Sequence, residues 1–171
     1  MLGAVNGATF TGGLELALGC DFLIASERAY FADTHARVGI LPGGGLTARL
    51  PTAVGTAMAR RMSLTGDPVD AATALRLGLV TEVIGHDDLL PRAVALATAI
   101  AEIPRGVARA MKEMYVASAA VGLVPALAEE QRIRSEHTTD WAGLDRRRVA
   151  VSERNRHGLG IDAFSPPVNH P

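Results

Sequence analysis

Glycine turns divide the start of the chain into short segments, and this feature most limits what the chain can fold into. Residues 3–6 are a short apolar stretch, which reads as the end of a strand before an Asn-Gly turn. A glycine pair at 12–13 precedes a run of helix formers, which Gly19 stops. The stretch "DFLIAS", residues 21–26, then predicts a short buried strand. A chain that turns this often forms short strands and helices, so we expect an α/β fold.

The segments that follow continue this pattern. "ERAYFAD", residues 27–33, predicts a turn into a second short strand, and "THARVGILPGGG", residues 34–45, predicts a loop. Helical spacing then runs from Leu46 to about Met62. Within this stretch, Pro51 is expected to end or kink a first short helix, because proline lacks the backbone N–H that a helix interior needs.

The stretch "DPVDAATALRLGLVTEVI", residues 67–84, contains the signals for another helix and strand. Asp70 is the expected cap of a short helix, since its side chain can accept a hydrogen bond from a free N–H in the first turn. Gly78 is the expected stop. The apolar run after it predicts a strand over Leu79–Ile84.

Apolar residues recur at helical spacing from about residue 88 to about residue 156. Residues 157–171 lack this spacing and contain several prolines. The expected helices cover approximately 89–103, 106–120, 125–138 and 140–156. We therefore expect an α/β core over residues 1–87, a helical region over 88–156 and a flexible tail over 157–171.

The composition excludes several classes of protein. The 171 residues include 17 basic and 18 acidic side chains, so no strong field marks a nucleic-acid or membrane-surface binder. Cys20 is the single cysteine, which excludes an intramolecular disulfide and a cysteine-based metal cluster. No apolar run approaches the roughly 18 residues that cross a bilayer, and the N-terminus lacks a signal-type pattern. We expect a soluble cytoplasmic protein.

The glycine pair before the first helix points to an anion-stabilising site. The first N–H groups of a helix have no partner within it, and the helix dipole makes that end partly positive. Glycine also lets a ligand approach the backbone closely. No lysine follows the pair, and neither phosphate-binding glycine motif is complete. Glu15, three residues after Gly12, would repel a phosphate, so the site better suits a carbonyl that becomes negative during reaction.

Glu15 itself is a candidate general base. A carboxylate is ionised at neutral pH and can accept a proton from water. Beside an oxyanion site it would serve chemistry next to a carbonyl group. The alternative is an ordinary acid in the first turn, which only favours the helix dipole.

The chain resembles a known family over residues 3 to about 156. The stretch "AVNGATFTGGLELALGCDFLIASERAYFADTHARVGILPGGGLTARLPTAVG" is similar to the core of the crotonase, or enoyl-CoA hydratase/isomerase, superfamily, and "LTGDPVDAATALRLGLVTEVI" continues the likeness. The resemblance implies a crotonase-like ββα spiral, here partial, followed by a helical oligomerisation region. It also implies an acyl-CoA thioester substrate, no cofactor beyond the coenzyme A of that substrate, and a trimer or dimer of trimers.

The resemblance also assigns roles to individual residues. Gly12 falls on the second of two backbone donors that form the family's oxyanion hole, and Glu15 falls on the first of two catalytic glutamates. His35 falls on the second glutamate, so the chain departs from the family here. His35 could donate a proton, orient water or the acyl chain, or be an ordinary loop histidine. Gly13, Pro42 and Gly43 are expected to contact the substrate.

The remaining polar residues are expected to have structural roles. Asp33 is expected to cap the turn that follows it. The other histidines are scattered without a second ligand at metal spacing, so we expect no metal site. The basic run Arg146–Arg148 is expected to form a solvated or subunit-facing surface, with a contact to a CoA phosphate as the alternative.

The resemblance does not extend to the N-terminal third of the family's members. In the family, that segment precedes the equivalent of Ala4 and includes the first oxyanion donor. Two hypotheses follow. The chain is an enoyl-CoA hydratase-like enzyme of the fatty-acid β-oxidation type, or an isomerase of the same family. Alternatively it is a truncated, non-catalytic remnant that acts as an assembly partner.

Overall fold

The computed structural model describes residues 1–119 and 123–136, together with the single positions 138, 140, 143, 146 and 149. The chain divides into two compact units, Met1–Ile103 and Pro104–Pro171. Within the described residues, no helix is both long enough and apolar enough to cross a membrane.

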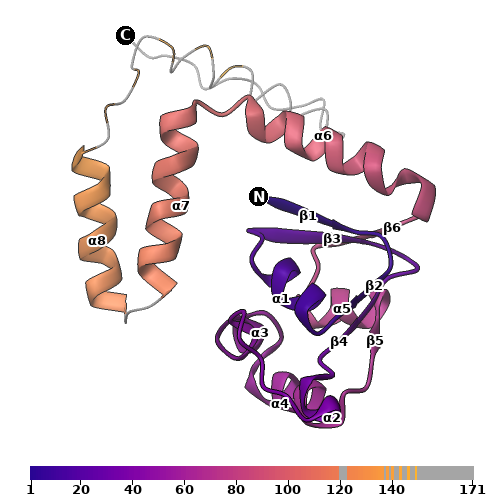
Figure 1. Cartoon of the computed structure of the whole chain (residues 1–171). Coiled ribbons are helices and arrows are strands. Elements are labelled where there is room, and N and C mark those ends of the chain that lie inside the picture. Colours follow the sequence, from indigo (N-terminus) through magenta and orange to yellow (C-terminus); the bar gives the residue numbers. More distant parts are fainter. Residues whose placement is uncertain are drawn as a thin grey trace, which may run out of the picture. The chain divides into compact units, whose positions relative to one another are not determined.

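The first unit contains a parallel sheet of three short strands. Its order is β1 (Leu2–Val5), β3 (Phe22–Ser26) and β6 (Glu82–Ile84), with β3 in the centre (Figure 1). Leu2 pairs with Phe22 at the start of β1, and every pairing is parallel. The strands expected at the chain start and in "DFLIAS" are confirmed, whereas the strand expected from Leu79 begins only at Glu82.

The first unit also contains a second sheet of three short strands, with the order β2 (Ala8–Phe10), β4 (Tyr30–Ala32) and β5 (Val69–Asp70). Strand β2 runs parallel to β4, and β4 pairs antiparallel with β5. The expected strand in "ERAYFAD" is therefore confirmed as β4. Strands β2 and β5 are not apparent from the sequence, because two or three residues are too few to show an alternating pattern.

Strand β3 separates two apolar clusters. Leu23 and Ala25 belong to the main core, while Ile24 packs against Leu89 and Ala93 of α6 (Leu89–Ala101). Successive side chains of a strand point to opposite faces, so both faces of β3 are covered. Figure 1 shows α6 on one side of β1 and β3, and α1 (Gly12–Leu18) on the other. The boundary between the two compact units follows Ile103, after the end of α6, because α6 packs on the sheet of the first unit.

The helices after the glycine-rich loop break at a different residue from the one expected. Helix α3 (Leu46–Val54) contains Pro51 in its interior, and α4 begins only after Gly55, at Thr56–Thr65. Of the two outcomes expected for Pro51, an end or a kink of the first helix, the end is wrong. Gly55 has φ 78° and ψ 153°, a conformation that interrupts a helix and that glycine alone adopts easily.

The helix signals around Asp70 are confirmed. Helix α5 (Ala71–Leu77) begins after Asp70, whose Oδ1 accepts a hydrogen bond from the Thr73 N–H at 2.7 Å. Gly78 follows the helix with φ 82°, in the left-handed region. The first helix of the chain, α1, also ends at a glycine as expected, with Gly19 as its C-terminal cap.

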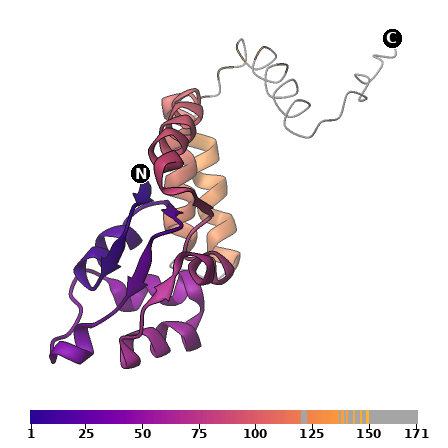
Figure 2. The same ribbon diagram turned by 90° about the vertical axis from the view of Figure 1, so that its right-hand side faces the viewer.

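The second unit contains a pair of helices that lie side by side in both views (Figures 1 and 2). They are α7 (Arg105–Ala119) and α8 (Leu123–Glu136), close to the expected bounds. The Arg132 guanidinium contacts carboxylates on both helices, Glu113 of α7 and Glu129 and Glu136 of α8. The expected helix over 140–156 lies largely outside the described residues, as do Arg147, Arg148 and the tail.

Candidate active site

Glu15 lies at the edge of the buried face of α1. Leu14 before it is fully buried and Leu16 after it is exposed, so the helix turns Glu15 to an intermediate position with 12% of its side chain exposed. Its Oε1 accepts a hydrogen bond from the Gly44 N–H at 2.6 Å. The carboxylate is therefore held by the glycine-rich loop before α3 and does not extend freely into solvent.

The contact between Glu15 and Gly44 explains why the loop carries glycine at this position. A Cβ added to Gly44 would lie 2.8 Å from both Cδ and Oε2 of Glu15. Real Cβ atoms do not approach this closely, so a side chain at position 44 would require the Glu15 carboxylate to shift from this position. Gly44 is a site residue that was not expected from the sequence, although the run of three glycines at 43–45 was a signal for it.

His35 is brought to the same place by a short helix that the sequence did not reveal. The segment expected to be a loop contains α2 (His35–Val38), and His35 is only 5% exposed. Its Nε2 lies 3.8 Å from Glu15 Oε2. That distance is longer than a direct hydrogen bond and suits an ion pair or a proton transfer across one water molecule.

Asp33 contacts His35 from the opposite side. Its Oδ1 accepts a hydrogen bond from the His35 backbone N–H at 3.2 Å, which confirms the expected capping of the following turn. The same oxygen lies 2.6 Å from His35 Nδ1. Burial raises the pKa of Asp33, but hydrogen bonds from Ser63 and His35 and the charge of His35 lower it more, so the pKa lies below its ordinary value.

The start of α1 is open and its backbone is unusual. Gly12 and Gly13 are exposed, and no atom lies within 4 Å of where their Cβ atoms would be. Among the described residues, none accepts a hydrogen bond from the Gly12 N–H. Thr11 has φ 53° and ψ −113°, which sets the direction of the peptide that carries this N–H. A non-glycine residue held there costs about 1–3 kcal/mol, which the surrounding structure must offset.

Two hydrogen bonds hold Thr11 in this conformation. Its N–H donates to Ala32 O at 2.9 Å, and its hydroxyl shares a hydrogen bond with the Thr34 hydroxyl. Thr34 directly precedes His35. The start of α1, with the Gly12 amide, is thereby tied to the segment that carries the imidazole.

The other expected substrate-contacting residues lie in the loop between α2 and α3. Pro42 is partly buried and Gly43 is exposed, next to Gly44. The described contact with the site is made by Gly44, not by these two residues.

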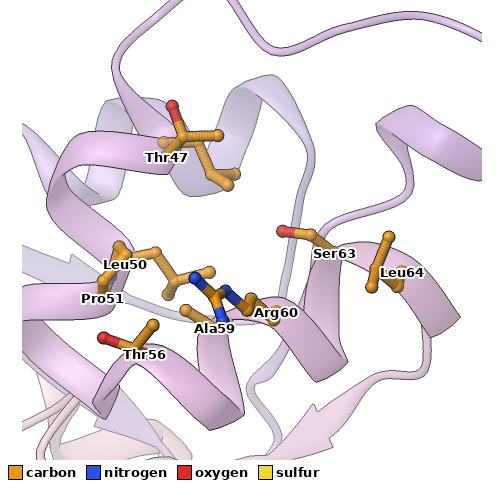
Figure 3. Close-up of a pocket in the computed structure, with 9 residues that line it drawn as sticks. Thr47, Leu50, Pro51, Thr56, Ala59, Arg60, Ser63 and Leu64 are labelled. Atoms are coloured by element: carbon orange, nitrogen blue, oxygen red, sulfur yellow. The ribbon is translucent and has the colours of Figure 1, made fainter.

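A cavity of about 560 Å³ lies between α3 and α4 (Figure 3). Its walls are mainly apolar, with Leu50, Ala59 and Leu64 among them, and Arg60 and Ser63 also line it. Figure 3 shows the Ser63 hydroxyl directed into the space between the two helices. Neither Glu15 nor His35 lines this cavity, but Ser63, which does, also contributes to the lowered pKa of Asp33.

His86 is the other histidine in the described part of the chain, and it is bonded away from Glu15 and His35. His86 Nδ1 lies 3.0 Å from the hydroxyl of Ser26, a fully buried residue of β3, and this bond fastens η1 (His86–Asp88) to the sheet. His137, His157 and His170 lie outside the described residues. Within the described part of the chain, no group of three or more His, Cys, Asp or Glu side chains is arranged to hold a metal ion.

Comparison with known proteins gives a consistent result. A family model described as enoyl-CoA hydratase/isomerase matches residues 1–146. A probable enoyl-CoA hydratase of Mycobacterium leprae, echA8, is 43% identical over 141 residues, which are 82% of this chain and 55% of that protein. A crotonyl-CoA hydratase of Syntrophomonas wolfei is 43% identical over 97 residues, which are 57% of this chain and 37% of that protein.

Solved structures show the same likeness. An enoyl-CoA hydratase from Mycobacterium tuberculosis matches with a TM-score of 0.66 and 52% identity, covering 79% of this chain and 63% of that one. A putative enoyl-CoA hydratase/isomerase from Mycobacterium abscessus matches with a TM-score of 0.79 and 32% identity, covering 87% and 58%. The chain spans about half the length of the curated relatives that it matches.

Proposed function

The chain belongs to the enoyl-CoA hydratase/isomerase family, and we propose that its activity is the addition of water to the α,β double bond of an enoyl-CoA thioester. The observation that carries this proposal is the approach of His35 Nε2 to Glu15 Oε2 at 3.8 Å, near the open start of α1. A base and a proton donor side by side match the two needs of this reaction, one proton removed from water and one delivered to carbon.

Glu15 acts as the base. Its carboxylate takes a proton from water while the water oxygen bonds to the β-carbon, and the electron pair of the double bond moves toward the thioester oxygen. The Gly44 N–H at 2.6 Å holds Oε1 and leaves Oε2, which faces His35, for the water. A positioned base of this kind contributes about 10²–10⁴-fold to the rate.

Gly12 stabilises the enolate oxygen through its backbone N–H. The amide belongs to the first turn of α1, where N–H groups lack helical partners and the helix dipole favours negative charge. Each such donor is worth about 10²–10³-fold in kcat. Gly13, Pro42 and Gly43 are the further residues that we propose to contact the substrate.

His35 supplies the proton to the α-carbon from its charged form. The reaction then leaves one proton on Glu15 and a neutral imidazole on His35. A proton that passes from Glu15 to His35 through one water restores both groups, and the net change is the addition of one water molecule. The site needs no other reactant.

The names of the relatives support a hydratase. The Mycobacterium leprae relative is described as a probable enoyl-CoA hydratase, and the Syntrophomonas wolfei relative is described as a crotonyl-CoA hydratase. A cytoplasmic location and a homotrimer or dimer of trimers remain predictions from the sequence and its resemblance.

A hydration assay with crotonyl-CoA tests the proposal. We expect turnover by the wild-type chain, and a loss of about 10²-fold or more in kcat for Glu15→Gln. Glu27→Gln is the matched control, because Glu27 is an exposed glutamate whose described hydrogen bond uses only its backbone N–H. No hydration by folded wild-type protein, or equal rates for the two variants, would contradict the proposal and favour the assembly-partner hypothesis.

A further inference from the structure

We propose that Asp33 is a positioning residue, which keeps the neutral form of His35 in the tautomer that accepts the returning proton at Nε2. This inference rests on the proposed function and extends it to a residue beyond those expected to be catalytic. Asp33 does not touch the reacting atoms: it lies on the far side of the imidazole, with Oδ1 2.6 Å from Nδ1. Asp33 is 1% exposed and His35 is 5% exposed, so water has little access to replace either partner.

The protonation state of Asp33 decides which imidazole nitrogen carries the proton. The pKa of Asp33 lies below its ordinary value of 3.8, so the group is a carboxylate at neutral pH. A carboxylate only accepts hydrogen bonds. His35 Nδ1 must then carry the proton of the 2.6 Å bond. In the neutral imidazole this leaves Nε2, the nitrogen that faces Glu15, ready to accept the returning proton.

More than one contact holds the Asp33 carboxylate in its position. Its Oδ1 also accepts from the His35 backbone N–H at 3.2 Å, which ties the carboxylate to the residue it orients. Ser63 of α4 also acts on this carboxylate and contributes to its lowered pKa. Asp33 follows β4 directly, and His35 begins α2, so the pair is fixed at the junction of two regular elements.

The arrangement has a direct chemical consequence. With a carboxylate at Nδ1 and another facing Nε2, a charged His35 has a negative partner on each side. An amide at position 33 removes one negative charge and can donate as well as accept, so it no longer selects a single tautomer. Loss of the orienting carboxylate in a serine-protease triad costs about 10⁴-fold in kcat for this reason.

The proposal is tested first on the wild-type protein, without any substitution. Two-dimensional ¹H–¹⁵N spectra of the imidazole groups report which nitrogen of each histidine is protonated. We expect His35, assigned by comparison with His35→Gln, to be protonated at Nδ1 at neutral pH. A neutral His35 protonated at Nε2 in the wild-type chain would overturn the proposal, whether or not the chain hydrates crotonyl-CoA.

Asp33→Asn provides the second test, with Asp67→Asn as the matched control at an exposed aspartate. We expect Asp33→Asn to lose the single Nδ1–H tautomer and to lower kcat for crotonyl-CoA hydration by about 10²-fold or more, while KM changes little. Asp67→Asn is expected to retain both wild-type properties. An unchanged tautomer and kcat in folded Asp33→Asn would overturn the positioning role.

The two proposals fail in different ways. If wild-type protein shows the Nδ1–H tautomer but no hydration, the proposed function fails, while Asp33 still orients His35. If hydration depends on Glu15 but not on Asp33, the proposed function stands and the positioning role is refuted. Asp33→Glu adds a rescue experiment: a carboxylate restored at this position is expected to recover the tautomer and part of the lost kcat.

Discussion

The Nε2 atom of His35 lies 3.8 Å from Oε2 of Glu15, although the two residues belong to different helices. Three contacts create this relationship. The Gly44 N–H donates a hydrogen bond to the Glu15 carboxylate, and the Asp33 carboxylate accepts one from the His35 imidazole. A hydrogen bond between the Thr11 and Thr34 hydroxyls joins the residue before α1 to the residue before α2. The pair is thus held in place by neighbouring residues on each side.

Gly44→Ala should impair both the stability and the activity of the chain. The new Cβ would lie 2.8 Å from Glu15 Cδ, so either the loop or the carboxylate must move. Such overpacking costs about 1–3 kcal/mol of unfolding free energy, and a shifted carboxylate should lower hydration. Urea unfolding and the crotonyl-CoA assay measure the two effects. Gly7→Ala is the control, because a Cβ there meets nothing within 4 Å.

Asp33 should make the folded chain less stable in acid. The pKa of Asp33 is lower in the folded chain than its ordinary value of 3.8. Its carboxylate therefore adds stability above that pH, and this contribution is lost as the pH falls through the folded pKa. We expect the unfolding free energy to decline below about pH 4, and Asp33→Asn to remove part of the decline. Urea unfolding at a series of pH values measures it. An identical pH slope for wild type and variant would contradict this expectation.

Gly55→Ala should destabilise the first unit. Gly55 has φ 78° and ψ 153°, a conformation nearly confined to glycine, so an alanine held there costs about 1–3 kcal/mol. Gly43→Ala is the comparison for stability alone, because Gly43 lacks a positive φ and its Cβ would meet no atom. Thermal unfolding followed by circular dichroism distinguishes the two variants. Equal melting temperatures would mean that Gly55 does not set the break between α3 and α4.

Two adjacent leucines of α6 should differ sharply in their effect on stability. Leu89 is 4% exposed and packs with Ile24, while Leu90 is 69% exposed. Leu89→Ala should cost about 2–5 kcal/mol of unfolding free energy, because it leaves a cavity in a packed cluster. Leu90→Ala should cost less than about 0.5 kcal/mol. Denaturant titration of both variants tests whether α6 covers the sheet in solution. Similar losses for both would argue against that packing.

Features that depend on adjacent residues could be predicted from the sequence. Asp70 caps a helix because its own side chain reaches the Thr73 N–H, and Gly19 and Gly78 end helices at the expected places. "DFLIAS" forms a strand because its continuous apolar run suits burial on both faces. These outcomes depend on interactions within a few residues, so local patterns were sufficient.

Other features were predicted wrongly from the sequence, or were not predicted, because they depend on distant parts of the chain. Strands β2 and β5 exist only through pairing with β4, and α2 forms within a segment that looked irregular. The first helix continues past Pro51, which was expected to end or kink it, and breaks at Gly55. Leu46, Leu50 and Val54 of α3 are buried, so tertiary packing supports a helix in which Pro51 lacks an N–H.

Residue types and their spacing were sufficient to predict the family likeness, most of the local elements, and Glu15 and His35 as candidate catalytic residues. The tertiary structure alone decided that Glu15 faces His35, that Gly44 holds Glu15, and that Asp33 bonds the other side of the imidazole. The reason is physical. Residue type and spacing set local backbone preferences, but the distance between side chains on separate elements depends on how those elements pack.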